Sequence, residues 1–323
     1  MSPDRFEHQL SLVTPLISRK STKLRSPISA AERLTLSYAT WQQVTRSNPS
    51  HLTFKLVDQR CQTLLEKPVT RSGRNYVKRV STPKSSQEWK RISEEFSSVW
   101  NFPHCIGAGN GKHVVIDCPE NTGSNFFNDK GAFSIVLLAY GDVNYCFTAV
   151  DVGQYGSGND SGAFVNSDIS KAFESNSFNV PEAEHVQGCA DKLPYVTVVD
   201  EGLSLKQYQM RPYPGKDLME ERAIFNCWLS RARRIIENIF GILVARWRIF
   251  RLRIRADVAT VERIVLACVA LHNYLRLTDD ACYSLNCFIN SEDNQGEIGS
   301  GDWRKIVSND KGVFRPFLGQ RAR

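Results

Sequence analysis

The chain of 323 residues is 41% hydrophobic and 23% charged, a composition typical of a globular protein with one large or two medium-sized domains. Its 41 Lys and Arg residues outnumber its 34 Asp and Glu residues, a modest positive balance that is compatible with nucleic-acid binding without establishing it. The nine cysteines are odd in number and include no C-x-x-C pair, which argues against a disulfide framework or a zinc knuckle.

The sequence shows no feature of a secreted or membrane protein. The N-terminal stretch MSPDRFEHQLSLV lacks the basic region and long apolar core of a signal peptide. Apolar runs such as Ile135–Tyr140 are too short to span a bilayer. We therefore expect a soluble protein of the nucleus, with the cytoplasm as a further compartment, and no membrane partner.

Helix-type patterns fill residues 1–65. Apolar residues near positions 6, 10, 13 and 16–17 recur with helical spacing, and Ser29 followed by Glu32 resembles a capping box. The stretch LTFKLVDQRCQTLLEK, residues 52–67, suggests a third helix. These patterns predict a small all-α N-terminal domain over residues 1–65.

Residues 66–101 form a predicted connector. Its first part, residues 66–91, carries eight Lys or Arg against two Glu, together with Pro, Ser and Gly. Such a composition is typical of a solvated linker, and a direct contact with DNA is the alternative that the charge leaves open.

Strand patterns replace helical ones between residues 102 and 200. AFSIVLLAYGDVNYCFTAVDV, residues 132–152, predicts two strands joined by a GDVN turn, with the second strand ending at Asp151. LPYVTVVDEGL, residues 193–203, predicts a short buried strand ending at Asp200. Helices are expected over residues 218–250 and 261–277, and a flexible tail over residues 278–323. The order of elements indicates an α/β domain over residues 102–277.

Polar residues follow apolar runs at three predicted strand ends. Asp151 and Asp200 each precede a glycine within two positions, and Asn110 occupies the same place in IGAGNGKHVVI, residues 106–116. Side chains at strand ends of α/β sheets face the crevice where ligands bind, and carboxylates there are candidate metal ligands. Turn formation or helix capping is the alternative for each residue taken alone.

A third candidate carboxylate lies on the predicted helix of residues 225–255. Glu237 lies on the flank of the apolar stripe, and eight arginines accompany this one acid between Ser230 and Arg255. An ion pair with a neighbouring arginine is one interpretation, and a metal ligand beside a bound polyanion is the other. We take Arg234 and Arg248 as candidate phosphate contacts.

Four stretches of this sequence resemble one family. They are FPHCIGAGNGKHVVIDC and its continuation to residue 164, LPYVTVVDEGLSLKQYQMRPYPG, ERAIFNCWLSRARRIIENIFGILVARWRIF and VERIVLACVALHNYL. Together they are similar to the PIF/Harbinger transposase-derived nucleases of the DDE superfamily, over about residues 88–277. The resemblance implies an RNase H-like catalytic domain with inserted helices, behind a helical domain containing a helix-turn-helix. It also implies DNA as substrate and a Myb/SANT-like DNA-binding partner protein.

The resemblance also implies a set of metal-binding carboxylates for Mg²⁺ or Mn²⁺. Carried over by motif, VDVG places one at Asp151, VVDEG another at Asp200, and RIIENIFG the glutamate at Glu237. The remaining family motif reads glycine, alanine, isoleucine, aspartate, glycine, lysine, histidine. This chain has GAGNGKH, so Asn110 replaces the aspartate and Gly109 the isoleucine.

Asn110 changes the expected chemistry. An amide keeps one acceptor oxygen but loses the negative charge that offsets bound metals, and its NH₂ group repels a cation. We therefore expect a preserved fold with weak or absent DNA cleavage. The helix-turn-helix motif is also degenerate here. Two hypotheses stay open: a divalent-metal-dependent nuclease that is impaired at Asn110, or a catalytically inactive protein that binds DNA or a partner; a decaying copy without a role is a third.

Overall fold

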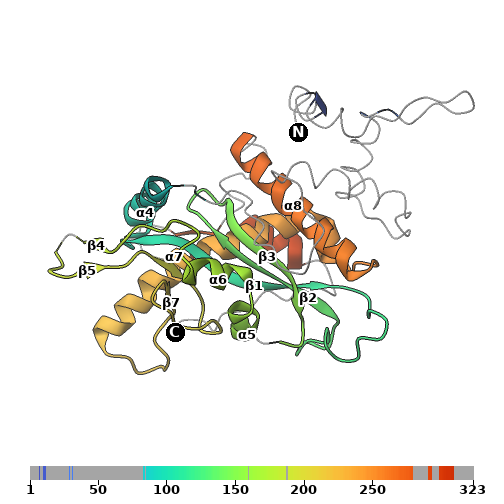
Figure 1. Ribbon diagram of the computed structural model, residues 1–323, viewed down its shortest axis with the longest axis horizontal. Helices are drawn as coiled ribbons and strands as arrows, with labels where there is room; N and C mark the ends of the chain where they lie inside the picture. Colours follow the sequence, from blue (N-terminus) through green and yellow to red (C-terminus); the bar gives the residue numbers. More distant parts are fainter. Residues whose placement is uncertain are drawn as a thin grey trace, which may run out of the picture. The chain divides into compact units, whose positions relative to one another are not determined.

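The computed structural model describes residues 85–158, 160–186, 188–278, 290–292 and 298–308, together with the isolated positions 7, 10, 11, 29, 31 and 83 (Figure 1). The predicted N-terminal domain, residues 1–65, therefore lies outside the described residues except at isolated positions. The chain divides into two compact units. One comprises Gly73–Val114 and Glu120–Phe240, and the other comprises Met1–Ser72, Val115–Pro119 and Gly241–Arg323.

The first described element is helix α4, Ser86–Trp100. The Ser85 side chain caps it by accepting a hydrogen bond from the Glu88 amide, and Asn101 ends it in the left-handed conformation. Trp89, Ile92 and Phe96 form its buried face. The second half of the predicted solvated connector is thus a core helix, because the spacing of three apolar residues outweighs the basic composition around them.

The unit Gly73–Val114 and Glu120–Phe240 is built around one mixed sheet. Its strands are β1 (Cys105–Val115), β2 (Ser134–Gly141), β3 (Phe147–Tyr155), β6 (Val196–Val198) and β7 (Gln209–Met210). They follow the order β3-β2-β1-β6-β7; β2 and β3 pair antiparallel, whereas β6 pairs parallel with both β1 and β7. Two short strands, β4 (Glu184–His185) and β5 (Lys192–Leu193), form a separate hairpin. The α/β prediction and the β2–β3 meander are confirmed.

The short helices α5 (Asp160–Val165) and α6 (Asp168–Glu174) follow strand β3. Phe173 of α6 packs against Tyr140 of β2 with ring centroids 5.9 Å apart. The Tyr140 ring lies over Gly109 of β1, so close that a Cβ atom on Gly109 would come within 2.3 Å of it. Gly109, Tyr140 and helix α6 therefore share one face of the sheet, which we call the Tyr140 face.

Helix α7, Glu220–Arg246, covers the opposite face of the sheet with the part that precedes residue 241. Ile239 fills the space where a Cβ atom of Gly141 would be, and Phe240 packs on Phe147 with ring centroids 6.2 Å apart. Neighbouring residues of a strand point to opposite faces, so Gly141 faces away from the side chain of Tyr140. We call this side, which also carries Asn110, the Asn110 face. The sheet is thus sandwiched between α6 and α7.

The other unit contains the short 3₁₀ helix η1 (Arg248–Arg251), helix α8 (Val258–Thr278), strands β8 (Ser291–Glu292) and β9 (Ile298–Gly299), and helix α10 (Asp302–Ser308). Helix α8 is long and apolar enough to cross a membrane. However, 61% of its apolar stretch is buried inside the protein, as expected of a core helix. Trp303 of α10 is buried against Gly241. Part of the predicted flexible tail is therefore a docked helix, anchored by one large aromatic side chain.

Candidate active site

Asn110 lies in strand β1, and Asp200 follows β6, the strand that pairs in parallel with β1. Ala108 of β1 pairs with Val198, the last residue of β6; β1 continues past Asn110, and Asp200 follows two residues after the end of β6. Residues next to each other on a strand point to opposite faces, so Asn110 lies on the face opposite to the one that Gly109 shares with Tyr140. The segment that carries Asp200 leaves the strand next to β1.

Asn110 is held inside strand β1 and is 8% exposed. Its Oδ1 atom accepts a hydrogen bond of 2.8 Å from the amide of Gly111. The oxygen that a metal would need is therefore already bonded to the next residue of the chain. The sequence pattern of a strand ending in a glycine turn is wrong here, since β1 runs through both glycines to Val115.

Asp200 lies two residues beyond strand β6 and is half-buried. Its Oδ1 atom accepts a hydrogen bond of 2.8 Å from the amide of Gly202, which tightens the turn after the strand. The predicted position at a strand end is thus confirmed for Asp200.

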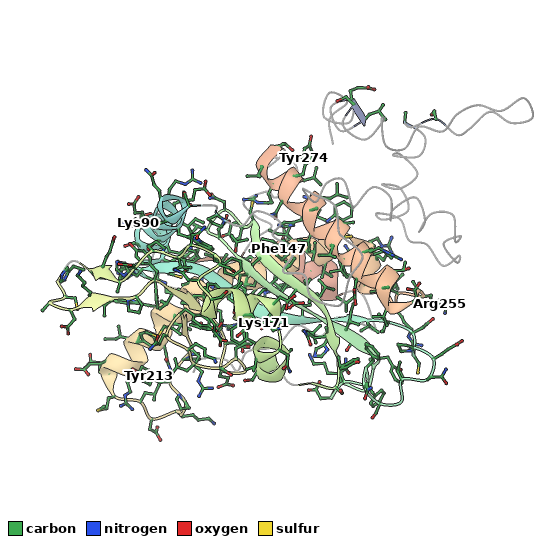
Figure 2. All side chains as sticks on the ribbon, viewed as in Figure 1. Lys90, Phe147, Lys171, Tyr213, Arg255 and Tyr274 are labelled. Atoms are coloured by element: carbon green, nitrogen blue, oxygen red, sulfur yellow. The ribbon has the colours of Figure 1, made fainter. Side chains whose placement is uncertain are left out.

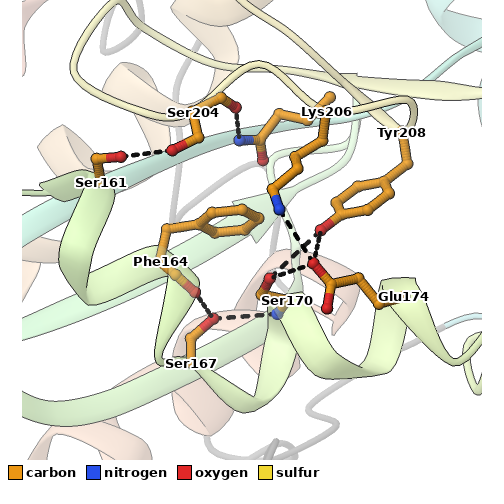
Figure 3. A network of polar contacts seen from close by, with 9 residues as sticks. Ser161, Phe164, Ser167, Ser170, Glu174, Ser204, Lys206 and Tyr208 are labelled. Carbon is orange, nitrogen blue, oxygen red and sulfur yellow. Dashed lines mark hydrogen bonds and ion pairs between the residues drawn. The ribbon is translucent and has the colours of Figure 1, made fainter.

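A polar network fixes the segment that follows Asp200. Ser204 contacts Ser161 of α5 through the two hydroxyl groups, and its carbonyl oxygen accepts a 2.7 Å hydrogen bond from Gln209 (Figure 3). Lys206 forms an ion pair of 3.2 Å with Glu174 of α6. The loop that carries Asp200 is therefore tied to α5 and α6, which restricts where the Asp200 carboxylate can move.

Glu237 of α7 is engaged by a basic neighbour one turn earlier. Its Oε1 atom lies 2.9 Å from Nη1 of Arg233, and the two side chains are 31% and 18% exposed, respectively. This is the ion pair that the sequence left open as an alternative to metal binding. A metal ligand at Glu237 would have to compete with this pair.

Asp151 lies on the other side of the sheet. It pairs with Leu138 of β2, two residues before Tyr140, so its side chain belongs to the Tyr140 face. Its Oδ2 atom accepts a hydrogen bond of 2.9 Å from the amide of Asp168, at the start of α6. Strand β3 also continues to Tyr155, so the prediction that it ends at Asp151 is wrong. Of the glycines that suggested a turn, Gly153 lies inside β3 with φ 114°, at a bulge opposite Val136 and Leu137, and Gly156 and Gly158 follow the strand.

The environment of Asp151 changes its acidity. Burial raises the pKa of its carboxyl from 3.8 to about 6, and the hydrogen bond from Asp168 opposes that shift only in part. Asp168 itself adds a nearby negative charge, which raises the pKa further. Asp151 is thus a buried carboxyl group that supports the N-terminus of a helix.

Comparison with known proteins bears on this geometry. The sequence profile described as DDE superfamily endonuclease matches residues 110–273, just over half of the chain, and begins at Asn110. The chain belongs to the DDE superfamily endonucleases. It is also 29% identical over 191 residues to the protein named Protein ALP1-like from Arabidopsis thaliana, covering 57% of this chain and 46% of that protein. No solved structure matches it.

These matches confirm the Harbinger-type family and the RNase H-like α/β catalytic fold that the sequence motifs implied. The chain spans about half the length of the curated relative it matches. DDE superfamily endonucleases generally use divalent metals, so the donor atoms on the Asn110 face can be tested against that requirement.

The donor set of this DDE endonuclease does not fit a two-metal centre. Such a centre needs several anionic oxygen ligands that converge from different elements. Among the described residues, no three His, Cys, Asp or Glu side chains gather closely enough to hold a metal ion. Asn110 supplies an engaged amide, Asp151 lies across the sheet, and Glu237 is paired with Arg233. The metal-ligand roles of Asp151, Asp200 and Glu237 stay predictions.

The candidate phosphate contacts differ in exposure. Arg234 is 7% exposed and offers little surface to a polyanion, whereas Arg248 of η1 is exposed. Asp117, a conceivable replacement for the missing carboxylate, lies 3.7 Å from Arg253 and 4.0 Å from Arg255 and is thus occupied by ion pairs. The roles of both arginines in DNA contact stay predictions.

Sequence reasoning missed the residue that explains Gly109. The Tyr140 ring crosses Gly109, and its hydroxyl donates a hydrogen bond to the fully buried Gln209 of β7. A glycine where the family motif has isoleucine was the available signal, because such a loss of side chain indicates the close approach of another group.

Proposed function

We propose that this chain is a transposase-derived DDE endonuclease that binds DNA in the nucleus and whose metal-dependent cleavage of phosphodiester bonds is impaired at Asn110. The observation that supports the proposal is the parallel pairing of β1 with β6, because β1 carries the amide of Asn110 and the segment after β6 carries Asp200. Asn110 supplies no negative charge to a metal site that would include Asp200.

The remaining charges on the Asn110 face support this proposal. Lys112 lies two residues after Asn110 on β1 and hence on the same face. Burial, together with the nearby Lys130, lowers the pKa of Lys112 well below its usual value, so this site disfavours additional positive charge. A divalent cation at this site would be attracted by the negative charge of Asp200. It could bind the Glu237 carboxylate only by displacing Arg233 from its ion pair with Glu237.

DNA binding without efficient cutting is the function that fits a site with too few negative charges to hold metal ions. The net charge of +7 favours a polyanionic partner. A Myb/SANT-like protein as DNA-targeting partner remains part of the proposal on the strength of the family resemblance alone.

The proposal is tested by nicking of supercoiled plasmid with Mg²⁺ or Mn²⁺. We expect the natural chain to leave the plasmid intact and Asn110→Asp to nick it at least about a hundredfold faster, since each tenfold corresponds to about 1.4 kcal/mol of barrier. Adding Glu237→Gln to Asn110→Asp should abolish the gained activity. Adding Asp151→Asn should leave it in place, because Asp151 lies on the opposite face of the sheet.

Binding to a fluorescent DNA duplex provides the control, because all four proteins should bind it equally if only the chemistry differs. If the natural chain cuts the plasmid and Glu237→Gln abolishes that cutting, Asn110 does not disable the site. If the Asn110→Asp, Asp151→Asn double variant no longer cuts, Asp151 is needed for the metal-dependent reaction after all.

A further inference from the structure

The N-terminal part of α7 presents an apolar stripe to solvent. Ile224 is 44% exposed and Trp228 is 38% exposed, one turn apart on the same side of the helix. Tryptophan and isoleucine bury large apolar areas when a partner covers them, and their joint exposure on one helix face is typical of an interaction surface.

This stripe belongs to a rigid part of the molecule. On another side of the same turns, Phe225 packs on Phe102 and Tyr213, with ring centroids 6.0 and 5.4 Å apart. Asn226 receives a hydrogen bond of 2.8 Å from the Tyr213 amide and donates one of 3.0 Å to its carbonyl oxygen. Figure 2 shows Tyr213 beside this end of α7. The exposed pair is thus held on a preformed surface, which lowers the entropic cost of binding.

Charges flank the apolar pair in a self-complementary order. Positions 221, 224, 228 and 231 follow one another at spacings of three, four and three residues, the spacing of a helix-pairing seam. The seam reads Glu221, Ile224, Trp228 and Arg231, acidic at one end and basic at the other. Glu221 is exposed and Arg231 is half-buried.

We propose that this seam, defined as Glu221, Ile224, Trp228 and Arg231, pairs antiparallel with the same seam of a second copy of the chain. A two-fold axis beside residue 226 places Ile224 of one copy against Trp228 of the other. The same axis places Glu221 of each copy against Arg231 of the other, so one surface satisfies itself in an isologous dimer. The inference is independent of the proposed function, since it needs neither metal nor DNA.

The acidic end of the seam disfavours nucleic acid as the occupant. Glu220 and Glu221 form the first turn of α7, and both would repel phosphates. The contact is also small, because four seam residues per copy lie well below a standard interface. We therefore expect a dimer in the micromolar range of affinity.

Sedimentation velocity of the full chain tests the proposal, after nuclease treatment that removes bridging nucleic acid. Across about 1–100 μM, the range in which a small interface dissociates, we expect the mass to shift from monomer to dimer. The double variant Ile224→Asp, Trp228→Asp should stay monomeric with an unchanged thermal midpoint, because both side chains are exposed. A natural chain that stays monomeric throughout, or a variant that still dimerises, would overturn the proposal.

A charge exchange tests the antiparallel register. Glu221→Arg and Arg231→Glu should each weaken the dimer by about tenfold, the effect of roughly 1.4 kcal/mol. The double variant Glu221→Arg, Arg231→Glu should regain the dimer affinity of the natural chain, because each ion pair is re-formed with its two charges exchanged. A double variant that stays weak would exclude this antiparallel register. Cys227 is exposed and lies next to the proposed axis, so a short bismaleimide should cross-link two copies, and Cys227→Ser should remove that product.

Discussion

The two faces of the central sheet differ in how completely their polar groups are used within the fold. On the Tyr140 face, Asp151 supports the start of α6, and Tyr140 bonds to Gln209. On the Asn110 face, the Asn110 side chain accepts a hydrogen bond from the adjacent Gly111 amide, and Glu237 forms an ion pair with Arg233 of its own helix. The first arrangement joins distant elements and is structural. The second joins near neighbours, so it can change without loss of the fold.

The comparison predicts that substitutions on the Tyr140 face change stability far more than substitutions on the Asn110 face. The largest effect is expected for Gly109→Ala. Its Cβ atom would lie 2.3–2.7 Å from three atoms of the Tyr140 ring, which would force the ring away from its place on the sheet. Overpacking of this kind costs about 3 kcal/mol.

Urea unfolding of the Gly109→Ala variant measures that loss. The double variant Gly109→Ala, Tyr140→Leu should recover part of it, because the smaller side chain leaves room for the methyl group. A single variant as stable as the natural chain would mean that the ring shifts at no cost and that the close approach is unimportant.

The next effect concerns Asp151 and depends on pH. Because the folded-state pKa is raised from 3.8 to about 6, the folded protein holds this proton more tightly than the unfolded chain. The stabilising contribution is therefore complete below about pH 4 and is lost as pH rises to about 6. Above that range the buried carboxylate costs about 1–3 kcal/mol.

Asp151→Asn removes this cost while its amide oxygen can still accept the hydrogen bond from Asp168. We expect the variant to be more stable than the natural chain at pH 7.5 and nearly equal to it at pH 4, as measured by thermal melts at both values. Equal stability at pH 7.5 would contradict the raised pKa. The Asp168 carboxylate is one of the charges that raise the pKa of Asp151. Asp168→Asn should therefore also increase stability at pH 7.5, by a smaller amount than Asp151→Asn.

The smallest effect is expected for Arg233→Gln on the Asn110 face. The variant loses one partly exposed ion pair between residues four apart on a helix, which is worth about 0.3–0.5 kcal/mol. Urea unfolding at low and high salt should show a difference of that order, smaller at high salt. A decrease in the free energy of unfolding above about 2 kcal/mol would show that the Asn110 face contributes to stability as much as the Tyr140 face does.

Sequence reasoning recovered the features that depend on local pattern. The β2–β3 meander and the strand before Asp200 follow from residues close together in the chain. The ion pair of Glu237 with Arg233 was one of the two interpretations that the sequence left open. The side of the sheet on which Asp151 lies did not follow. It depends on the register between β2 and β3 and on the continuation of β3 through Gly153, and a shift of one residue exchanges the two faces.

The contact between Gly109 and Tyr140 also constrains how the sequence could have changed over time. A return to the family motif needs isoleucine at position 109 and aspartate at position 110. The aspartate can return in a single step, since Asn110 and aspartate have nearly the same shape. The isoleucine cannot return while the Tyr140 ring lies on the Gly109 backbone. Position 110 can therefore regain its carboxylate by one substitution, whereas isoleucine at position 109 needs a second change that moves or replaces the Tyr140 ring.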